Sequence, residues 1–115
     1  MQEVNAGIIG LGNVGMGTLS ILTENAEQIA LKLGFPLRVK AVCSRSVAAK
    51  NLPASAQPIF QTTNWRQVVE HPEVDIVAEL VGGTGVAREI IDAAISHKKS
   101  VVTANKELID RKSVV

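Results

Sequence analysis

The sequence predicts an α/β fold in which helices cover a parallel sheet. Short runs rich in branched apolar residues alternate with longer segments whose apolar residues recur at helical spacing. The links between most of these segments are short, which favours right-handed crossovers between parallel strands. A glycine-rich turn follows the first apolar run. The length of 115 residues suits one domain of this kind.

The composition is that of a folded globular protein. Hydrophobic residues make up 46% of the chain and charged residues 20%, which argues against a disordered segment or a disulfide scaffold. The net charge of +1 provides no broad positive field, so we expect neither a nucleic-acid partner nor a membrane partner. Cys43 is the only cysteine, and no signal segment or apolar run of about 18 residues occurs. These features predict a soluble cytoplasmic protein.

The first half of the chain predicts a strand, a long helix and a second strand. Val4–Ile9 is short and apolar, which favours a buried strand. Residues 13–33 contain no proline and place leucines, an isoleucine and an alanine on one stripe, which predicts a single helix of roughly six turns. Gly34 and Pro36 end that helix. Leu37–Ser44 is the second predicted strand.

The second half begins with a predicted loop over residues 47–62, because Pro53 and Pro58 lie among small and polar residues. Thr63 or Asn64 can cap the helix that follows. The remaining predicted elements are a helix from 65 to about 71, a strand at 75–81, a helix at 86–97, a strand at 100–103 and a short helix from about 106. The expected sheet therefore has four parallel strands.

The glycine-rich turn reads Gly10-Leu11-Gly12-Asn13-Val14-Gly15, the pattern G-x-G-x-x-G. Gly10 permits a tight turn, Gly12 lets the backbone approach a pyrophosphate, and Gly15 lets the helix pack close to the strand. The pyrophosphate would accept hydrogen bonds from the free N–H groups of Asn13 and Val14. The alternative is a glycine-rich turn without a ligand. The position between a strand and a helix favours a Rossmann-like, doubly wound parallel sheet in three α/β/α layers.

The end of the second predicted strand indicates which dinucleotide is bound. An Asp or Glu at this position would accept hydrogen bonds from the adenosine ribose, but no carboxylate occurs between Glu27 and Glu70. The strand ends instead in Ser44-Arg45-Ser46. Arg45 and Ser44, with Ser46 as a weaker candidate, predict a pocket for the 2′-phosphate of NADP. The alternatives are that Arg45 is a solvated loop cation, or that it stacks on adenine and NAD is also accepted.

The carboxyl ends of the last two predicted strands face the same crevice as the glycine turn. Gly82 and Gly83 would let the nicotinamide ribose approach the backbone, although a plain turn explains them equally well. Thr103 ends the last strand, and Lys106 follows it, where its ammonium group can position an oxygen of a substrate or cofactor. Taken alone, a lysine at a helix start is more often solvated.

Several other residues are of types that can take part in chemistry or in core packing. Cys43 is expected to be a small buried hydrophobe, and Trp65 to pack the short helix onto the sheet. Glu79 interrupts an apolar run, so its carboxylate must find donors or a cation, and a structural or interface role is favoured over catalysis. Gly17 reflects either close packing or a tolerated defect. Neither histidine has a second ligand at metal spacing, so no metal site is expected.

Four segments together, GIIGLGNVGMGT, VCSRS, DIVAELVGG and VVTANKELI, resemble the N-terminal cofactor domain of homoserine dehydrogenase. The resemblance covers nearly the whole chain, and the E-L-V-G-G and T-A-N-K segments are its most specific parts. It implies reversible NAD(P)-dependent interconversion of L-homoserine and L-aspartate 4-semialdehyde, on the route to threonine, methionine and isoleucine. It also implies that residues 11–14 hold the pyrophosphate, that Arg45 holds the 2′-phosphate, and that Thr103 and Lys106 line the nicotinamide and substrate side. Lys106 would lie close to the reacting centre as a catalytic residue.

The chain differs from the family in length. Homoserine dehydrogenases carry a substrate-binding and dimerisation domain after the cofactor domain, and the full-length enzymes are expected to be homo-oligomers. Residues 1–115 are therefore expected to be one NAD(P)-binding domain that binds NADP, or also NAD, with little or no turnover. The alternative is a stand-alone nucleotide-sensing module, which would not need Lys106. A methyltransferase or a different dehydrogenase is disfavoured by Arg45 and by the T-A-N-K segment.

Overall fold

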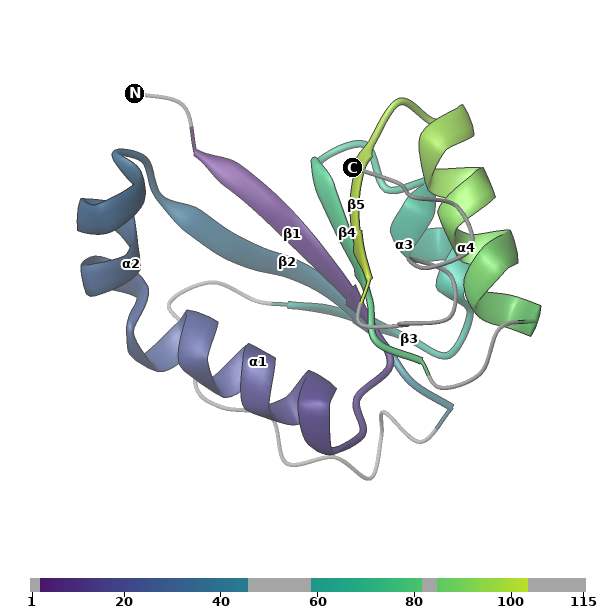
Figure 1. The fold of residues 1–115 in the computed structure, drawn as a ribbon, viewed down its shortest axis with the longest axis horizontal. Coiled ribbons are helices and arrows are strands. Elements are labelled where there is room, and N and C mark those ends of the chain that lie inside the picture. Colours follow the sequence, from purple (N-terminus) through teal and green to yellow (C-terminus); the bar gives the residue numbers. More distant parts are fainter. Residues whose placement is uncertain (1–2, 46–58, 82–84, 104–115) are drawn as a thin grey trace.

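The computed structural model of the chain describes residues 3–45, 59–81 and 85–103, which form one sheet with helices on both faces (Figure 1). In chain order the elements are β1 (Val4–Ile9), α1 (Asn13–Glu24), α2 (Ala26–Leu33), β2 (Leu37–Cys43), β3 (Phe60–Thr62), α3 (Trp65–Val69), β4 (Ile76–Glu79), α4 (Gly85–Ser96) and β5 (Ser100–Thr103). In this part of the chain no helix is long and apolar enough to cross a membrane.

The sheet has five strands in the order β3-β2-β1-β4-β5, and every pair is parallel. The chain moves outward from β1 through β2 to β3 and then returns to the other side of β1 with β4. This reversal opens a crevice at the carboxyl ends of the central strands, where ligands bind in sheets of this type. In the register there, Ile9 lies opposite both Cys43 and Glu79.

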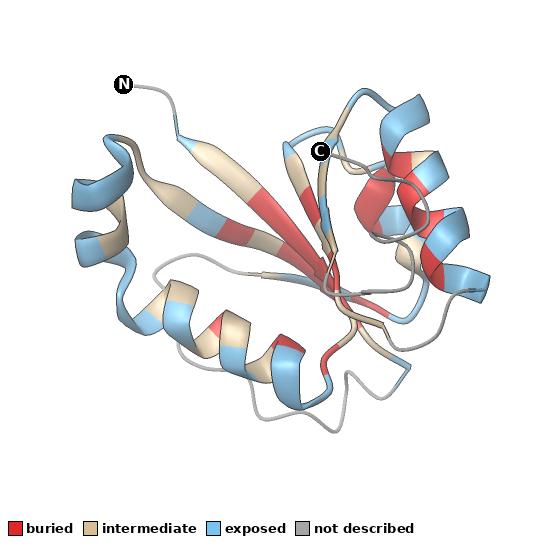
Figure 2. Cartoon of the chain, viewed as in Figure 1, coloured by how far each residue is buried: buried red, intermediate tan, exposed pale blue. Residues whose placement is uncertain are grey.

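The helices form the two outer layers. The α1 and α2 helices lie on one face of the sheet, while α3 and α4 lie on the other (Figure 1). Ile8 belongs to the buried cluster beneath α1, and its neighbour Ile9 belongs to the larger cluster beneath α3 and α4. Successive residues of β1 thus serve opposite faces, as the pleat of a strand requires. The buried residues follow the strands and the inner faces of α1, α3 and α4 (Figure 2). The predicted three-layer α/β/α fold is confirmed.

The prediction of one helix over residues 13–33 is wrong. The chain breaks at Asn25, whose φ of −110° and ψ of 26° are not helical, and α2 starts at the next residue. Asparagine is a weak helix former. Just before the break, the Thr23 hydroxyl donates to the Leu19 carbonyl at 2.9 Å, a type of bond that bends helices. No residue of α2 is buried, so packing does not force the two helices into line.

The prediction of a loop over residues 47–62 is wrong at its end, because residues 60–62 form β3. Phe60 lies opposite Ala41 and Thr62 opposite Cys43, which adds a fifth strand to the expected four. The strand has three residues and lies at the edge of the sheet, so no alternation of apolar and polar residues reveals it. The part of the predicted loop before residue 59 lies outside the described residues, as do residues 104–115 with the last predicted helix.

The other elements occur where the sequence predicts them, with small changes at their ends. The strands at 4–9 and 100–103 match in full, and the strand predicted at 75–81 is Ile76–Glu79. Gly34 ends α2 with a φ of 87°, and its N–H donates to the Ala30 carbonyl at 2.9 Å. Of the two predicted caps of α3, Asn64 is the one that acts, because its Oδ1 accepts from the N–H of Arg66 at 3.0 Å.

Candidate functional site

A cleft of about 630 Å³ lies at the carboxyl ends of the strands, where the sheet order reverses. The ends of β1, β2 and β4 contribute to it, together with the starts of α3 and α4. Its lining residues are Ile9, Gly10, Leu11, Gly12, Cys43, Ser44, Arg45, Thr63, Trp65, Leu80, Val81, Val86 and Ile90. Arg45 is the only charged residue in the described part of this lining. The glycine turn and the end of β2 are therefore brought to one cleft, as the sequence predicts.

Gly10 forms the turn that leaves β1. Its φ is 103°, a conformation that residues with a Cβ rarely adopt. Its N–H donates to the Cys43 carbonyl at 2.8 Å, which ties the turn to the end of β2. A Cβ at this position would also lie 2.9 Å from the Leu80 carbonyl carbon and the Val81 nitrogen. The turn therefore requires glycine both for its backbone angle and for its contact with the end of β4.

The other two glycines of the motif have different surroundings. A Cβ on Gly15 would overlap the carbonyl oxygen of Gly10, so the first turn of α1 lies directly against the turn before it. A Cβ on Gly12 would meet no atom of the described residues within 4 Å. Gly10 and Gly15 thus have the conformational roles expected of them. Nothing in the fold around Gly12 requires glycine, and its role toward a ligand stays a prediction.

The N-terminus of α1 opens beside the cleft. Gly12 is its N-cap residue, no side chain of the described residues caps the helix, and its first turn contains no acidic residue. The first hydrogen bond of the helix runs from the Met16 N–H to the Gly12 carbonyl at 2.8 Å. The N–H groups of the residues before Met16, which include the exposed Asn13 and Val14, have no partner within the helix. They leave the positive end of the helix dipole available to an anion.

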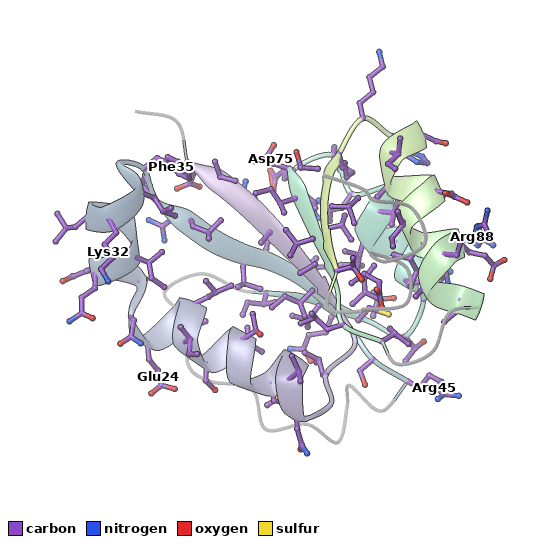
Figure 3. All side chains as sticks on the ribbon, viewed as in Figure 1. Glu24, Lys32, Phe35, Arg45, Asp75 and Arg88 are labelled. Atoms are coloured by element: carbon purple, nitrogen blue, oxygen red, sulfur yellow. The ribbon has the colours of Figure 1, made fainter. Side chains whose placement is uncertain are left out.

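Arg45 follows β2 at the rim of the cleft. Its side chain is exposed, and Figure 3 shows it at the end of the molecule opposite to Phe35 and Asp75. Ser44 is half-buried beside it, and its backbone N–H donates to the Thr62 carbonyl at 3.2 Å. Both residues line the cleft, whereas Ser46 lies outside the described residues.

The predicted sites on the other strand ends are described only in part. Thr103 ends β5 and is half-buried, but it is not among the residues that line the cleft. Asn13, Val14 and Gly15 lie in the first turn of α1 and are also not lining residues. Gly82, Gly83 and Lys106 lie outside the described residues.

Glu79 is fully buried at the end of β4. One carboxylate oxygen accepts from the N–H of Val81 at 2.7 Å, and the other accepts from the hydroxyl of Thr103 at 2.6 Å. The requirement that this carboxylate find donors is therefore met by two residues at neighbouring strand ends.

Sequence reasoning missed Thr63 as a cleft residue and gave Trp65 a packing role alone. Trp65 packs against the core beneath α3, as predicted, but it also lines the cleft. The guanidinium group of Arg66 lies 4.5 Å from the centre of its ring. Both missed residues follow β3, so recognising that short strand would have placed them at the ligand edge of the sheet.

The titratable groups of the cleft do not form a catalytic cluster. Cys43 is buried on the cleft floor, and burial raises the pKa of its thiol, which keeps it in the unreactive protonated form. Within residues 3–45, 59–81 and 85–103, no group of three metal-ligating side chains occurs. What the described cleft offers is free backbone N–H groups, an arginine and apolar walls, a combination suited to binding a phosphate-containing nucleotide.

Comparison with known proteins identifies the family. Residues 10–114 match the family model described as homoserine dehydrogenase, NAD-binding domain. The homoserine dehydrogenase of Methylobacillus glycogenes is 41% identical over 109 residues, which are 95% of this chain and 26% of that protein. The homoserine dehydrogenase of Pseudomonas aeruginosa is 43% identical over 109 residues, again 95% of this chain, and 24% of that protein.

The fold has the same relatives. The crystal structure of a homoserine dehydrogenase from Thiobacillus denitrificans superimposes with a TM-score of 0.82 at 41% identity, covering 97% of this chain and 26% of that one. The chain thus spans about a quarter of the length of the relatives that it matches.

Proposed function

The chain belongs to the family of homoserine dehydrogenase NAD-binding domains, and from this membership we propose that residues 1–115 are one domain that binds NADP in the cleft, with NAD as a weaker ligand. The single observation that carries the proposal is the convergence of the Gly10–Gly15 turn and Arg45 on one cleft at the sheet reversal. The family supports a nicotinamide cofactor, and the residues of the cleft support the choice of NADP.

The glycine turn fits a dinucleotide pyrophosphate. The position of Gly12 is open where a Cβ would stand, and the tight packing of Gly15 on Gly10 brings the start of α1 to the cleft. We assign the pyrophosphate to the backbone of residues 11–14, whose N–H groups lie at the positive end of α1. On the other side of the cleft, Gly82, Gly83 and Thr103 would accompany the nicotinamide half.

Arg45 is the basis for proposing NADP. A cleft selective for NAD presents a carboxylate to the ribose hydroxyls at the end of the second strand. Among residues 3–45, 59–81 and 85–103, those that line this cleft include no carboxylate, and Arg45 is their one charged side chain. A guanidinium group forms paired, charge-assisted hydrogen bonds with a phosphate, and the Ser44 hydroxyl can donate another.

The reaction that we propose for the whole protein is the reversible conversion of L-homoserine to L-aspartate 4-semialdehyde in a cytoplasmic homo-oligomeric enzyme. The bound cofactor supplies hydride transfer. This domain binds and orients the cofactor, and Lys106 is the residue that we expect to position an oxygen at the reacting centre. Hydride transfer also requires a substrate held in close contact with the nicotinamide. We assign the substrate contacts to the part of the relatives that the chain does not span, so we expect little or no turnover from these 115 residues.

The Arg45→Ala substitution tests the choice of cofactor. The unaltered chain and the variant are titrated by calorimetry with NADPH and with NADH at fixed salt. We expect the unaltered chain to prefer NADPH by at least about tenfold, or 1.4 kcal/mol, and the variant to lose that preference while keeping its NADH affinity. Arg38→Ala is the matched control, because Arg38 is an exposed arginine of β2, the strand that precedes Arg45, but it pairs with Glu3 at 2.7 Å and does not line the cleft. Equal losses for both cofactors would contradict a 2′-phosphate role for Arg45.

A further inference from the structure

Glu79 is a buried carboxylate that is not among the described residues lining the cofactor cleft. Its exposed fraction is 0%, in a strand whose other residues are apolar. The described residues include the ion pairs of Arg38 with Glu3 and of Lys40 with Glu73, and Glu79 takes part in neither. Burial of a carboxylate is costly unless hydrogen bonds replace its hydration. An apolar side chain of similar size would avoid that cost. We therefore ask what the two hydrogen bonds of Glu79 do for the site.

The first bond holds the end of β4 against the glycine turn. Glu79 accepts from the N–H of Val81 at 2.7 Å. The same Val81 nitrogen lies 2.9 Å from the point where a Cβ of Gly10 would stand, so the Leu80–Val81 peptide packs on the turn that leaves β1. Val81 itself lines the cleft. The carboxylate therefore fixes the orientation of a peptide that forms part of the cleft wall.

The second bond sets the polarity of Thr103. Glu79 and Thr103 are opposite each other in the β4–β5 register, and the Thr103 hydroxyl donates to the carboxylate at 2.6 Å. A threonine hydroxyl has one hydrogen and two acceptor lone pairs. Because Glu79 accepts that hydrogen, the Thr103 hydroxyl can only accept a hydrogen bond from any further partner.

From these two bonds we propose that Glu79 is a positioning residue of the nicotinamide half of the site, which holds Thr103 as a hydrogen-bond acceptor and the end of β4 against the glycine turn. The donor that Thr103 would accept from is an amide N–H or a hydroxyl of the ligand, groups found in the carboxamide and ribose of a nicotinamide nucleotide. The inference rests on the proposed function, since Glu79 and Thr103 end neighbouring strands at the edge of the sheet that holds the cleft, but neither residue is among the described residues that line it.

The Glu79→Gln substitution isolates the polarity of Thr103. The glutamine carbonyl can still accept from the Val81 N–H, so the contact with the glycine turn is kept. Its NH₂ group then faces the Thr103 hydroxyl, which must accept from it and turn its own hydrogen elsewhere. Thr103→Val removes the hydroxyl at nearly constant shape, and Thr103→Ser restores it. Glu70→Gln is the matched control, because Glu70 is an exposed carboxylate at the end of α3.

Each variant of the 115-residue chain is titrated with NADPH and with 2′-phospho-ADP-ribose, which lacks the nicotinamide. We expect Glu79→Gln and Thr103→Val to weaken NADPH binding by at least about tenfold and to change binding of the fragment by less than about twofold. Thr103→Ser and Glu70→Gln should bind both ligands like the unaltered chain. Thermal unfolding without ligand measures stability separately, and if Glu79→Gln does not fold, Thr103→Val decides the question.

The outcomes separate this inference from the proposed function. Equal weakening of both ligands, or no weakening of either, would overturn the positioning role of Glu79 and leave the cofactor proposal intact. Equal affinity of the unaltered chain for NADPH and for the fragment would also overturn it. Failure of the unaltered chain to bind either ligand would overturn the proposed function, and the inference with it.

Discussion

At the scale of single residues, the shape of the cleft depends on the absence of a Cβ atom at Gly10 and Gly15. Gly15 has no room for a Cβ, because the carbonyl oxygen of Gly10 occupies that space. Gly17 is on the same helix two residues later, and a Cβ on it would meet no atom of the described residues within 4 Å. The two glycines therefore have opposite surroundings: Gly15 has no room for a side chain, and Gly17 has room for one. Close packing against the described residues does not explain why residue 17 is glycine.

This contrast gives the first stability prediction. Gly15→Ala should lower the free energy of unfolding by about 3 kcal/mol or more, because the backbone of the turn must move to relieve the overlap. Gly17→Ala should raise it by about 0.5–1 kcal/mol, because alanine has the better helix propensity and its methyl group fits. Urea denaturation of both variants measures these changes. A tolerated Gly15→Ala substitution would contradict the packing described for the turn.

Sequence reasoning performed well for residues whose roles depend on their neighbours in the chain. The positions of Gly10 and Gly15 followed from one motif, and the donors required by Glu79 followed from the cost of burying a charge. It did not find Thr63 as a cleft residue, because that assignment depends on the path of β3 across the sheet. Contacts between distant segments leave no local pattern to read.

At the scale of elements, the cap of α3 controls one wall of the cleft. Asn64 is the N-cap, and its side chain accepts from the Arg66 N–H at 3.0 Å. The helix has only five residues, so one capping bond is a large share of its stabilisation. Trp65, the first residue of the helix, lines the cleft and therefore depends on this cap for its position.

Asn64→Ala should reduce the free energy of unfolding by about 1 kcal/mol, the usual cost of losing an N-cap side chain. Thr63→Ala is the control, because Thr63 is also exposed and precedes Asn64, but it is not the N-cap residue of α3. Thermal unfolding followed by circular dichroism compares the two. Similar effects of the two substitutions would show that the Asn64 bond has no special importance.

The two errors in the predicted elements have different physical causes. The apolar stripe predicts one helix over residues 13–33, but α2 buries none of its residues, so the stripe does not correspond to a continuous packed face. The strand β3 is too short to show a period, and its pairing with β2 stabilises it. Local patterns fail where tertiary contacts decide whether an element forms or continues.

At the scale of the whole molecule, the order of the strands creates the cleft. The sheet runs outward from β1 on one side and then resumes on the other, which leaves a crevice at the carboxyl ends of the central strands, beside the start of α1. The sequence predicts this parallel, doubly wound arrangement because strands and helices alternate along it. It does not predict that Thr63 and Trp65 line the cleft, since that depends on the fifth strand, β3, and on the position of α3.

The central claim is that a nicotinamide dinucleotide binds at the carboxyl edge of this sheet, and an NMR titration tests it most directly. Backbone amide resonances of the ¹⁵N-labelled chain are followed as NADPH is added. The largest shifts are expected at Gly10, Gly12 and Val81, which line the cleft. Lys32 and Asp75, which lie away from Arg45 in Figure 3, should not shift. Shifts centred on Lys32 or Asp75, or no shifts at all, would contradict the account.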